Sequence, residues 1–516
     1  MATETRFAWR PLIAICFGWF MVIVDATIVN IALPQLGREL GASVSGLQWV
    51  VDGYTVVFAG LLLSAGWLGD RLGGKRVFQG GLGLFIAASV ACGLAPSMGV
   101  LVGARVVQGA GTALLVPASL SLLQVGYHDR RSRARAIGTW AMVGGFAAGS
   151  GPLLGGILTY SLGWRWIFFV NVPFGVLGIV LAGRWVRAGR HGQRGTGSGE
   201  RLDVPGQLAG MIALLSVTAA MVQAGRSGWT SPLTLAGFAI FAVAAAAFAV
   251  TERRVTTPMV PPSLFRSRAL AAATAVGGLM NLGFYGQLFV LTLYFQQVRG
   301  DSPLLTGLAL LPQTGVIALG SALGGRVTGR SGPRIPMITG MTAGAAGFVA
   351  LIIVSRSIPY WAIVLPMAAT GFGISFTMPA ATAAVVEAAP PGRTGVATGT
   401  LNASRQVGGA IGIALLGTFV AGGTAGFVPG MHISLAVAAA AFALAAGLAL
   451  TVPRPRPEAR GGARAGAARP GCTPAGDGPG APGARARGGP WCGRHTVTAN
   501  SRSAGRARST TARPER

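Results

Sequence analysis

One carboxylate, Asp25, lies deep inside a long apolar stretch, where a single acid can take up and release a proton. A low-dielectric environment favours the protonated form of a carboxyl group, so this residue type suits proton exchange. Asp25 could instead be a structural acid that pairs with a neighbouring helix. Asn30 lies about 140° from Asp25 around a helix, at about 100° per residue, so the two need not share one wall of a cavity.

Two arginines share helix faces with other polar residues inside apolar stretches. The spacing i, i+3, i+4 and i+7 occurs twice, in Arg105, Gln108, Gly109 and Thr112 and again in Asn402, Arg405, Gln406 and Gly409. Residues at this spacing lie on one face of a helix. A buried arginine needs a carboxylate, carbonyl groups or water beside it. Each arginine is therefore either a functional group or a static anchor between helices.

Small residues form a stripe on one face of another predicted helix. The stripe consists of Gly138, Gly145, Gly149, Pro152 and Gly156. Small residues let helices approach closely, and a proline inside a helix can bend it. The stripe predicts tight helix packing at this face.

A charged, glycine-rich loop follows the second apolar stretch. It contains Gly66, Asp70, Arg71, Gly73 and Lys75. Asp70 can accept hydrogen bonds from the N-terminus of a nearby helix, or pair with an arginine. The loop is therefore either a latch that forms and breaks or an ordinary solvated run of charges.

Polar and aromatic residues in other apolar stretches are candidates for lining a substrate cavity. Aromatic walls suit large, planar or cationic molecules, although aromatic residues in membranes more often pack or anchor the chain at the interface. The predicted cavity residues are Asn30, Tyr54, Gln108, Asn281, Phe284, Tyr285, Asn402 and Arg405.

The elements that must position these residues are membrane-spanning helices. Of the 516 residues, 51% are hydrophobic and 11% are charged, which is too little charge for a soluble chain of this length. Open strands would leave backbone groups unpaired in lipid, so the spans are helices and the fold class is all-α. Fourteen spans are expected, at about 11–33, 47–68, 77–95, 100–124, 136–159, 165–183, 205–224, 232–251, 270–296, 303–325, 335–354, 359–380, 394–421 and 432–452.

The loop charges predict the orientation of these spans. With the N-terminus inside, the inner loops carry the one lysine and most of the loop arginines. Cytoplasmic loops carry such an excess, so both termini are expected in the cytoplasm of a multi-pass protein.

Two parts of the chain resemble each other in register. Gly66, Arg71 and Gly73 recur as Gly325, Arg330 and Gly332. Such repeats indicate duplicated halves, as in one large class of secondary transporters. We expect two pseudo-symmetric six-helix bundles and an inserted pair of helices. The predicted division is 1–183 for the N-terminal bundle, 184–204 for a cytoplasmic loop, 205–251 for the inserted hairpin, 252–452 for the C-terminal bundle and 453–516 for a disordered basic tail.

Several other functions are disfavoured by the sequence. The net charge of +28 reflects topogenic loops and the tail, so no nucleic-acid partner is expected. The cysteines have no metal-ligand spacing, and no phosphate-binding loop of the Gly-x-x-x-x-Gly-Lys-Ser/Thr type occurs. We expect no metal, no cofactor and no ATP drive.

Several motifs resemble one family in the right order. The stretch Asp25-Ala-Thr-Ile-Val-Asn30-Ile-Ala-Leu-Pro34 is similar to the signature of the fourteen-span drug:proton antiporters of the major facilitator superfamily. The loop from Gly66 to Arg76 resembles the superfamily's inner-loop motif, with Gly74 where a basic residue is usual. The other matching stretches are 105–111, 145–156 with Gly151-Pro152, 164–173 and 402–406.

The resemblance covers roughly residues 8 to 452 and implies a function. Exporters that confer antibiotic resistance in bacteria look most similar. It implies that Arg105 adjusts the proton affinity of a nearby acid, and that the glycine stripe with Gly151 is a seam that moves between two access states. We therefore expect export of drugs or antibiotics in exchange for protons across the bacterial cytoplasmic membrane, by a monomer in contact with lipids.

Three alternatives stay open at this point. The motifs do not separate a drug exporter from an exporter of an endogenous amino acid, siderophore or lipid-like metabolite. A non-transporting membrane sensor is the second alternative. A membrane enzyme is the third, but the four histidines are scattered and lack acid partners.

Overall fold

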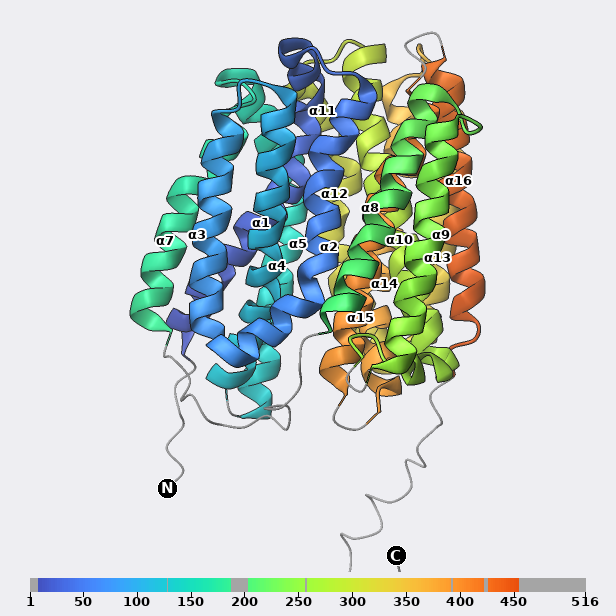
Figure 1. The fold of residues 1–516 in the computed structure, drawn as a ribbon. Coiled ribbons are helices and arrows are strands. Elements are labelled where there is room, and N and C mark those ends of the chain that lie inside the picture. Colours follow the sequence, from blue (N-terminus) through green and yellow to red (C-terminus); the bar gives the residue numbers. More distant parts are fainter. Residues whose placement is uncertain are drawn as a thin grey trace, which may run out of the picture. The chain divides into compact units, whose positions relative to one another are not determined.

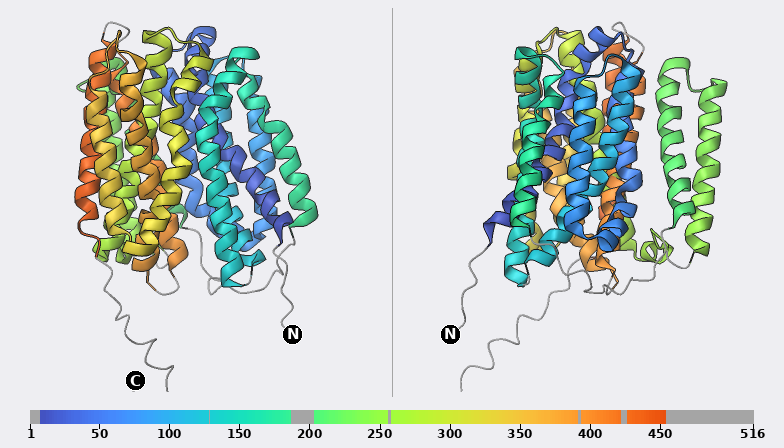
Figure 2. Two further views of the ribbon diagram at one scale, coloured as in Figure 1. Left: turned by 180° about the vertical axis from the view of Figure 1, so that it is seen from behind. Right: turned by 60° about the vertical axis from the view of Figure 1, so that its left-hand side comes forward.

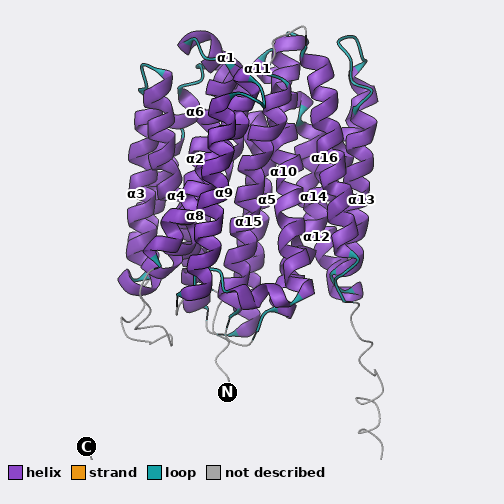
Figure 3. Cartoon of the chain, turned by 45° about the vertical axis from the view of Figure 1, so that its right-hand side comes forward, coloured by secondary structure: helices purple, strands orange, loops and turns teal. Residues whose placement is uncertain are grey.

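The computed structural model describes residues 8–127, 129–186, 203–255, 258–390, 393–421 and 426–453. Every regular element in these ranges is a helix, as Figure 3 shows. The predicted cytoplasmic loop, apart from its two ends, and nearly all of the predicted tail fall outside the described residues.

The helices fall into three groups along the chain (Figure 1). The first group is α1 (Trp9–Leu40), α2 (Val44–Leu72), α3 (Gly74–Gly93), α4 (Met98–Gly126), α5 (Arg130–Ser161), the short α6 (Trp166–Phe169) and α7 (Asn171–Trp185). The second group is α8 (Val204–Ser227), α9 (Pro232–Arg254) and the 3-10 helix η1 (Pro262–Arg266). The third group is α10 (Arg268–Leu293), the π-helix η2 (Tyr294–Val298), α11 (Pro303–Ala309), α12 (Leu311–Ser331), α13 (Arg334–Leu351), α14 (Tyr360–Ala388), α15 (Thr394–Phe419) and α16 (Phe427–Ala449).

Local sequence signals set the helix ends. Ser43 and Ser97 cap the N-termini of α2 and α4 by accepting hydrogen bonds from backbone N–H groups three residues later. Asp203 caps α8 in the same way. The turn between α2 and α3 needs Gly73, whose φ of 91° is a conformation that other residues rarely adopt. The conformation of this turn therefore explains why a glycine occupies position 73 in the predicted latch loop.

The chain is a multi-pass membrane protein by the length and composition of its helices. In the described part, 12 helices are long and apolar enough to cross a membrane. The helices α2 and α15 are 29 and 26 residues long and lie where the second and thirteenth spans are expected, but they are not among the twelve. The number of fourteen spans therefore stays a prediction.

The same pattern of helix packing occurs in the first and third groups. In the first group α1 packs on α5 and α7, and α4 packs on α2 and α3. In the third group α10 packs on α15 and α16, and α14 packs on α12 and α13. The pairs correspond one to one in chain order, which is the arrangement that duplicated halves produce.

The hairpin of α8 and α9 lies beside the other two groups, as the right-hand view of Figure 2 shows. Helix α8 packs against α2 of the first group and α15 of the third. Most of the large apolar side chains of α9 are exposed, among them Leu233, Leu235, Ile240 and Val243. An apolar surface of this extent suits contact with lipid tails.

The first and third groups meet closely at the upper end of Figure 1, where α1 is joined to α2. A Cβ atom added at Gly156 of α5 would lie 2.8 Å from the Pro303 carbonyl oxygen of α11. Gln48 of α2 donates hydrogen bonds to the carbonyl oxygens of Ile413 and Ala414 of α15, at 3.1 and 2.9 Å. The two halves are therefore tightly closed at this end.

Candidate functional site

Asp25 and Arg105 form a buried ion pair in the first group of helices. Arg105 Nη1 lies 2.6 Å from Asp25 Oδ2, and the two side chains are 1% and 0% exposed. Asp25 is near the middle of α1, and Arg105 is in α4. The structure thus brings together the two residues that the sequence predicts for proton coupling.

Further polar residues complete the surroundings of Asp25. Its Oδ1 accepts hydrogen bonds from Gln108 Nε2 at 3.0 Å and from Asn171 Nδ2 at 2.9 Å. Ser89 Oγ accepts from the same two amides at 3.3 and 3.0 Å, and donates to the Phe168 carbonyl at 2.9 Å. Together with Arg105, these amides give the Asp25 carboxylate three side-chain hydrogen-bond donors.

Arg105 is fixed by contacts on several sides. Its Nε donates to the Val50 carbonyl at 3.1 Å, and its Nη1 also donates to Gln108 Oε1 at 2.8 Å. The guanidinium carbon lies 4.2 Å from the centre of the Tyr54 ring, within the range of a cation–π contact. The buried Nη2 has no hydrogen-bond partner among the described residues, so this atom remains available as a hydrogen-bond donor.

Tyr54 connects the ion pair to a pocket. Thr112 Oγ1 donates to the Tyr54 hydroxyl at 3.0 Å. Gly109 faces the Tyr54 backbone, where a Cβ would lie 3.1 Å from the carbonyl carbon, so this glycine allows α4 to approach α2. The position of the Tyr54 ring is therefore set from α4.

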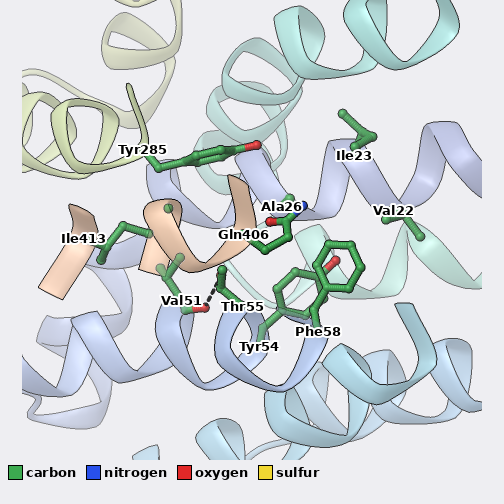
Figure 4. A pocket seen from close by; sticks show the side chains of 11 residues that line it. Val22, Ile23, Ala26, Val51, Tyr54, Thr55, Phe58, Tyr285, Gln406 and Ile413 are labelled. Atoms are coloured by element: carbon green, nitrogen blue, oxygen red, sulfur yellow. Dashed lines mark hydrogen bonds between the residues drawn. The ribbon is translucent and has the colours of Figure 1, made fainter. Parts of the chain in front are cut away.

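The pocket lies between the two halves, with walls from α1, α2, α10 and α15 (Figure 4). Figure 4 shows the Tyr54 and Phe58 rings on one side and the Tyr285 ring on another. Its lining residues are Val22, Ile23, Ala26, Val51, Tyr54, Thr55, Phe58, Tyr285, Gln406, Gly409 and Ile413. The walls are apolar and aromatic with few polar groups, as in many small-molecule sites, but in this conformation the cavity volume is about 30 Å³, far less than a drug-sized molecule needs.

The predicted cavity residues divide into several places. Tyr54 and Tyr285 line this pocket, whereas Gln108 belongs to the ion-pair network. Asn30 donates to the Ala26 and Thr27 carbonyls of its own helix. The remaining four are not lining residues of the pocket: Asn281 and Phe284 are buried in α10, and Asn402 and Arg405 lie in α15 close to Gln406.

Arg405 has a different environment from Arg105. Its Nη1 lies 3.5 Å from Asn402 Oδ1, and its Nη2 lies 3.3 Å from Met378 Sδ. Its Nε is buried without a hydrogen-bond partner. Within the described residues, no carboxylate forms an ion pair with it.

Sequence reasoning gave too little weight to three residues. Ser89 and Asn171 are polar residues inside apolar stretches, which is the signal that could have identified them. Asp52 lies eight residues after Val44, the first residue of α2, and so about two turns inside the helix. Asp52 is fully buried, and among the described residues neither of its oxygens has a hydrogen-bond partner. Asp25 is therefore not the only deeply placed carboxylate.

The glycine stripe of α5 faces the third group of helices. Beyond the approach of Gly156 to α11, a Cβ at Gly149 would lie 3.0 Å from the Thr314 carbonyl oxygen of α12. Gly145 is looser, with Ile317 at 4.0 Å, and Gly138 has no neighbour within 4 Å. The seam of α5 with α11 and α12 is thus tight at the upper end and open lower down.

Two other residues of the predicted seam have different neighbours. Gly151 faces Thr27 of α1 instead of the other half. The Pro152 carbonyl lies against Gly307 of α11, where a Cβ would come within 2.6 Å of its oxygen.

The predicted latch loop is only partly described. Lys75 Nζ donates to the Gly183 carbonyl of α7 at 2.8 Å, and a Cβ at Gly66 would meet no atom within 4 Å. Arg71 is exposed at the end of α2. The Asp70 side chain lies outside the described residues. Among the described residues there is also no group of three or more His, Cys, Asp or Glu side chains that could hold a metal ion.

Comparison with known proteins gives consistent matches. The profile of the Major Facilitator Superfamily matches residues 15–413 and 275–499. The methylenomycin A resistance protein of Streptomyces coelicolor is 37% identical over 404 residues, covering 78% of this chain and 84% of the relative. The tetracenomycin C resistance and export protein of Streptomyces glaucescens is 36% identical over 413 residues, covering 80% of this chain and 76% of the relative.

One solved structure has a similar fold. It is a bacterial homolog of the human lysosomal transporter Spinster, in an inward-facing and unoccupied conformation. Its TM-score is 0.60 at 16% sequence identity, and the alignment covers 86% of this chain and 97% of that one.

Proposed function

The chain belongs to the Major Facilitator Superfamily, and we propose that it exports small-molecule drugs or antibiotics in exchange for protons. It is a membrane transporter rather than an enzyme. The observation that carries the proton-coupling part is the buried Asp25–Arg105 pair, which adjoins the pocket through Tyr54. A bacterial cytoplasmic membrane supplies the inward proton gradient for such an exchange.

The ion pair suggests how a proton and a cargo molecule exclude each other. Protonation of Asp25 removes the charge that Arg105 neutralises, so Arg105 must find another acceptor. Movement of Arg105 would disturb Tyr54, whose ring it contacts and which forms a wall of the pocket. The protonated and charged forms of Asp25 would therefore favour different states of the pocket. Such differential affinity is what couples two fluxes.

The α5 seam supports alternating access. Its close glycine contacts all lie at the upper end, which we assign to the outside of the cell. In this conformation the outer side is closed, and export requires the seam to open there as the halves rock about the central pocket. This assignment places both termini and the latch loop in the cytoplasm.

We further propose fourteen spans, formed by the twelve apolar helices together with α2 and α15. The division into bundles at 1–183 and 252–452, with an inserted hairpin at 205–251, follows the repeated packing pairs. We assign 184–204 and 453–516 to the cytoplasm, and a monomer surrounded by lipid as the working unit. Asp70 is assigned to a latch, so Asp70→Asn should impair transport and leave substrate binding intact; unchanged turnover contradicts the latch.

Flux measurements in everted membrane vesicles test the function. Vesicles with this protein should accumulate methylenomycin A or tetracenomycin C when respiration acidifies their lumen. A protonophore that collapses the pH difference should stop the accumulation, and vesicles without the protein serve as the control. Accumulation at the same rate after the gradient is collapsed contradicts proton coupling. No accumulation of any compound in a wider antibiotic panel contradicts drug export.

A further inference from the structure

Arg405 is a cation in the middle of a membrane helix, and no described carboxylate forms an ion pair with it. It lies 11 residues after the first residue of α15, Thr394, and 14 before the last, Phe419. Its hydrogen-bonding contacts are one amide oxygen and one thioether sulfur, at 3.5 and 3.3 Å. Both distances are long for a charged donor.

Arg105 and Arg405 differ in whether a described carboxylate balances their charge. Arg105 is neutralised by Asp25 at 2.6 Å, whereas the described ion pairs leave Arg405 out. An arginine cannot shed its proton to escape a low-dielectric site, so its charge must be balanced from outside its own side chain. The two described acids of the third group do not balance the charge of Arg405, because Asp301 pairs with Arg299 and Glu387 is exposed near the end of α14.

Arg405 does not itself line the pocket, but it lies in α15 beside residues that do. Gly409 lies one turn further along the same face of α15 and lines the pocket, and a Cβ added there would lie 3.3 Å from the Tyr285 ring. Gln406, the next residue in the chain, also lines the pocket (Figure 4). The aliphatic part of Arg405 packs 3.2 Å from the Cβ position of Gly277 in α10.

We propose that Arg405 is the anion-recognition residue of the export pocket, and that the cargo is a small planar or apolar molecule with a carboxylate, phenolate or enolate group. The planar guanidinium fork matches a carboxylate, while Tyr54, Phe58 and Tyr285 contact the apolar part. This inference rests on the proposed function and names the substrate class of the same site.

An anionic cargo has a consequence for the driving force. A proton that moves inward and an anion that moves outward transfer charge in the same direction. An inside-negative membrane potential therefore drives both movements, in addition to the pH difference. For a neutral cargo, only the proton carries charge.

The test compares matched acids and esters in everted vesicles. The probes are radiolabelled 2-naphthoate and biphenyl-4-carboxylate, each with its methyl ester. A weak acid distributes passively away from an acidic lumen, so its accumulation there requires a transporter. Wild-type vesicles should accumulate the acids in preference to the esters. Arg405→Gln should lower acid uptake roughly tenfold to a hundredfold, the range expected for the loss of charge-assisted hydrogen bonds, and leave ester uptake unchanged.

Arg405→Lys keeps the charge without the planar fork and should retain an intermediate acid uptake. The wild-type preference is itself a test that does not depend on any variant folding. A wild type that prefers the esters, or transports no acid while it still exports a compound of the antibiotic panel that has no acidic group, overturns the inference. Equal losses for acids and esters in Arg405→Gln also overturn it. If no compound moves under any gradient, the proposed function fails as well.

Discussion

The ring of Tyr54 lies 4.2 Å from the guanidinium carbon of Arg105 and also forms part of the pocket wall. The charge pair and the pocket therefore share one side chain. A change in the position of Arg105 is transmitted to the pocket through direct contact, without a longer chain of residues.

This relationship predicts that the Tyr54 ring contributes more to the coupling of proton and cargo than the Tyr54 hydroxyl group does. Tyr54→Phe removes the hydrogen bond from Thr112 but keeps the cation–π contact, so cargo-induced proton release in proteoliposomes should stay within about threefold of wild type. Tyr54→Leu removes the ring and should reduce the coupling by tenfold or more, on the order of the 1.4 kcal/mol that a desolvated cation–π contact contributes. Equal coupling in the two variants contradicts this role.

Asp25→Asn should abolish proton-coupled efflux while the protein still inserts in the membrane. The amide cannot exchange a proton, although it keeps the shape of the carboxyl group and can still accept from Gln108 or Asn171. Uptake into everted vesicles measures efflux, and the amount of protein in the membrane fraction serves as control. A variant that still concentrates cargo against its gradient shows that another group couples the fluxes.

The Asp25–Arg105 pair should also contribute to stability. Removing one partner leaves a buried charge, so Arg105→Gln is expected to lower the free energy of unfolding by about 3–5 kcal/mol. The double variant Asp25→Asn with Arg105→Gln should lose less than the sum of the two single variants. Glu39→Gln is the matched control, because the Glu39–Arg165 pair is about 41% exposed and should contribute under about 1 kcal/mol.

Denaturant unfolding in detergent, followed by tryptophan fluorescence, measures the wild type and the four variants. Additive losses in the double variant would mean that the two charges do not stabilise each other.

Gly156→Val should block transport by preventing closure of the α5 seam. A Cβ at this position would lie 2.8 Å from the Pro303 carbonyl oxygen, which is backbone and cannot move aside easily. The control is Gly138→Val on the same helix, which meets no neighbour within 4 Å and should transport normally. Solvent accessibility of a cysteine placed in the pocket, probed from the outside, should rise in Gly156→Val only. Equal accessibility in both variants contradicts a gate at this seam.

Asp52→Asn should fold as well as the wild type or better. No described residue donates a hydrogen bond to either Asp52 oxygen, so a charged carboxylate gains nothing there and a neutral side chain avoids the cost of burying a charge. The midpoint of thermal unfolding should be unchanged or raised, in contrast to Arg105→Gln. A clear decrease in the midpoint would reveal a partner for Asp52 in the protein.

The sequence predicts the helical membrane fold well because apolar length and loop charge are strong local signals. The glycine stripe is also visible from spacing alone, but its partner is not, since only the folded chain places Gly149 and Gly156 against α11 and α12. Asp25 and Arg105 are each conspicuous as charges in apolar stretches. Their contact is not predictable from spacing, because they lie on different helices 80 residues apart.

Other site features depend on geometry that a sequence does not encode locally. Asn171 of α7 donates to Asp25 and to Ser89 of α3, and in each of these two helices a single polar residue could equally face lipid headgroups or another helix. Whether a carboxylate pairs with Arg405 depends on which residues the folded chain places beside it, so no local sequence motif predicts it.

The hairpin has a further consequence for molecules that dissolve in the bilayer. Helix α8 packs on both α2 and α15 and covers that boundary between the halves, whereas among the described helices neither α8 nor α9 packs on α5. A lipid-soluble compound that approaches sideways therefore meets the hairpin at one boundary between the halves and not at the other. The carrier has a front and a back within the plane of the membrane.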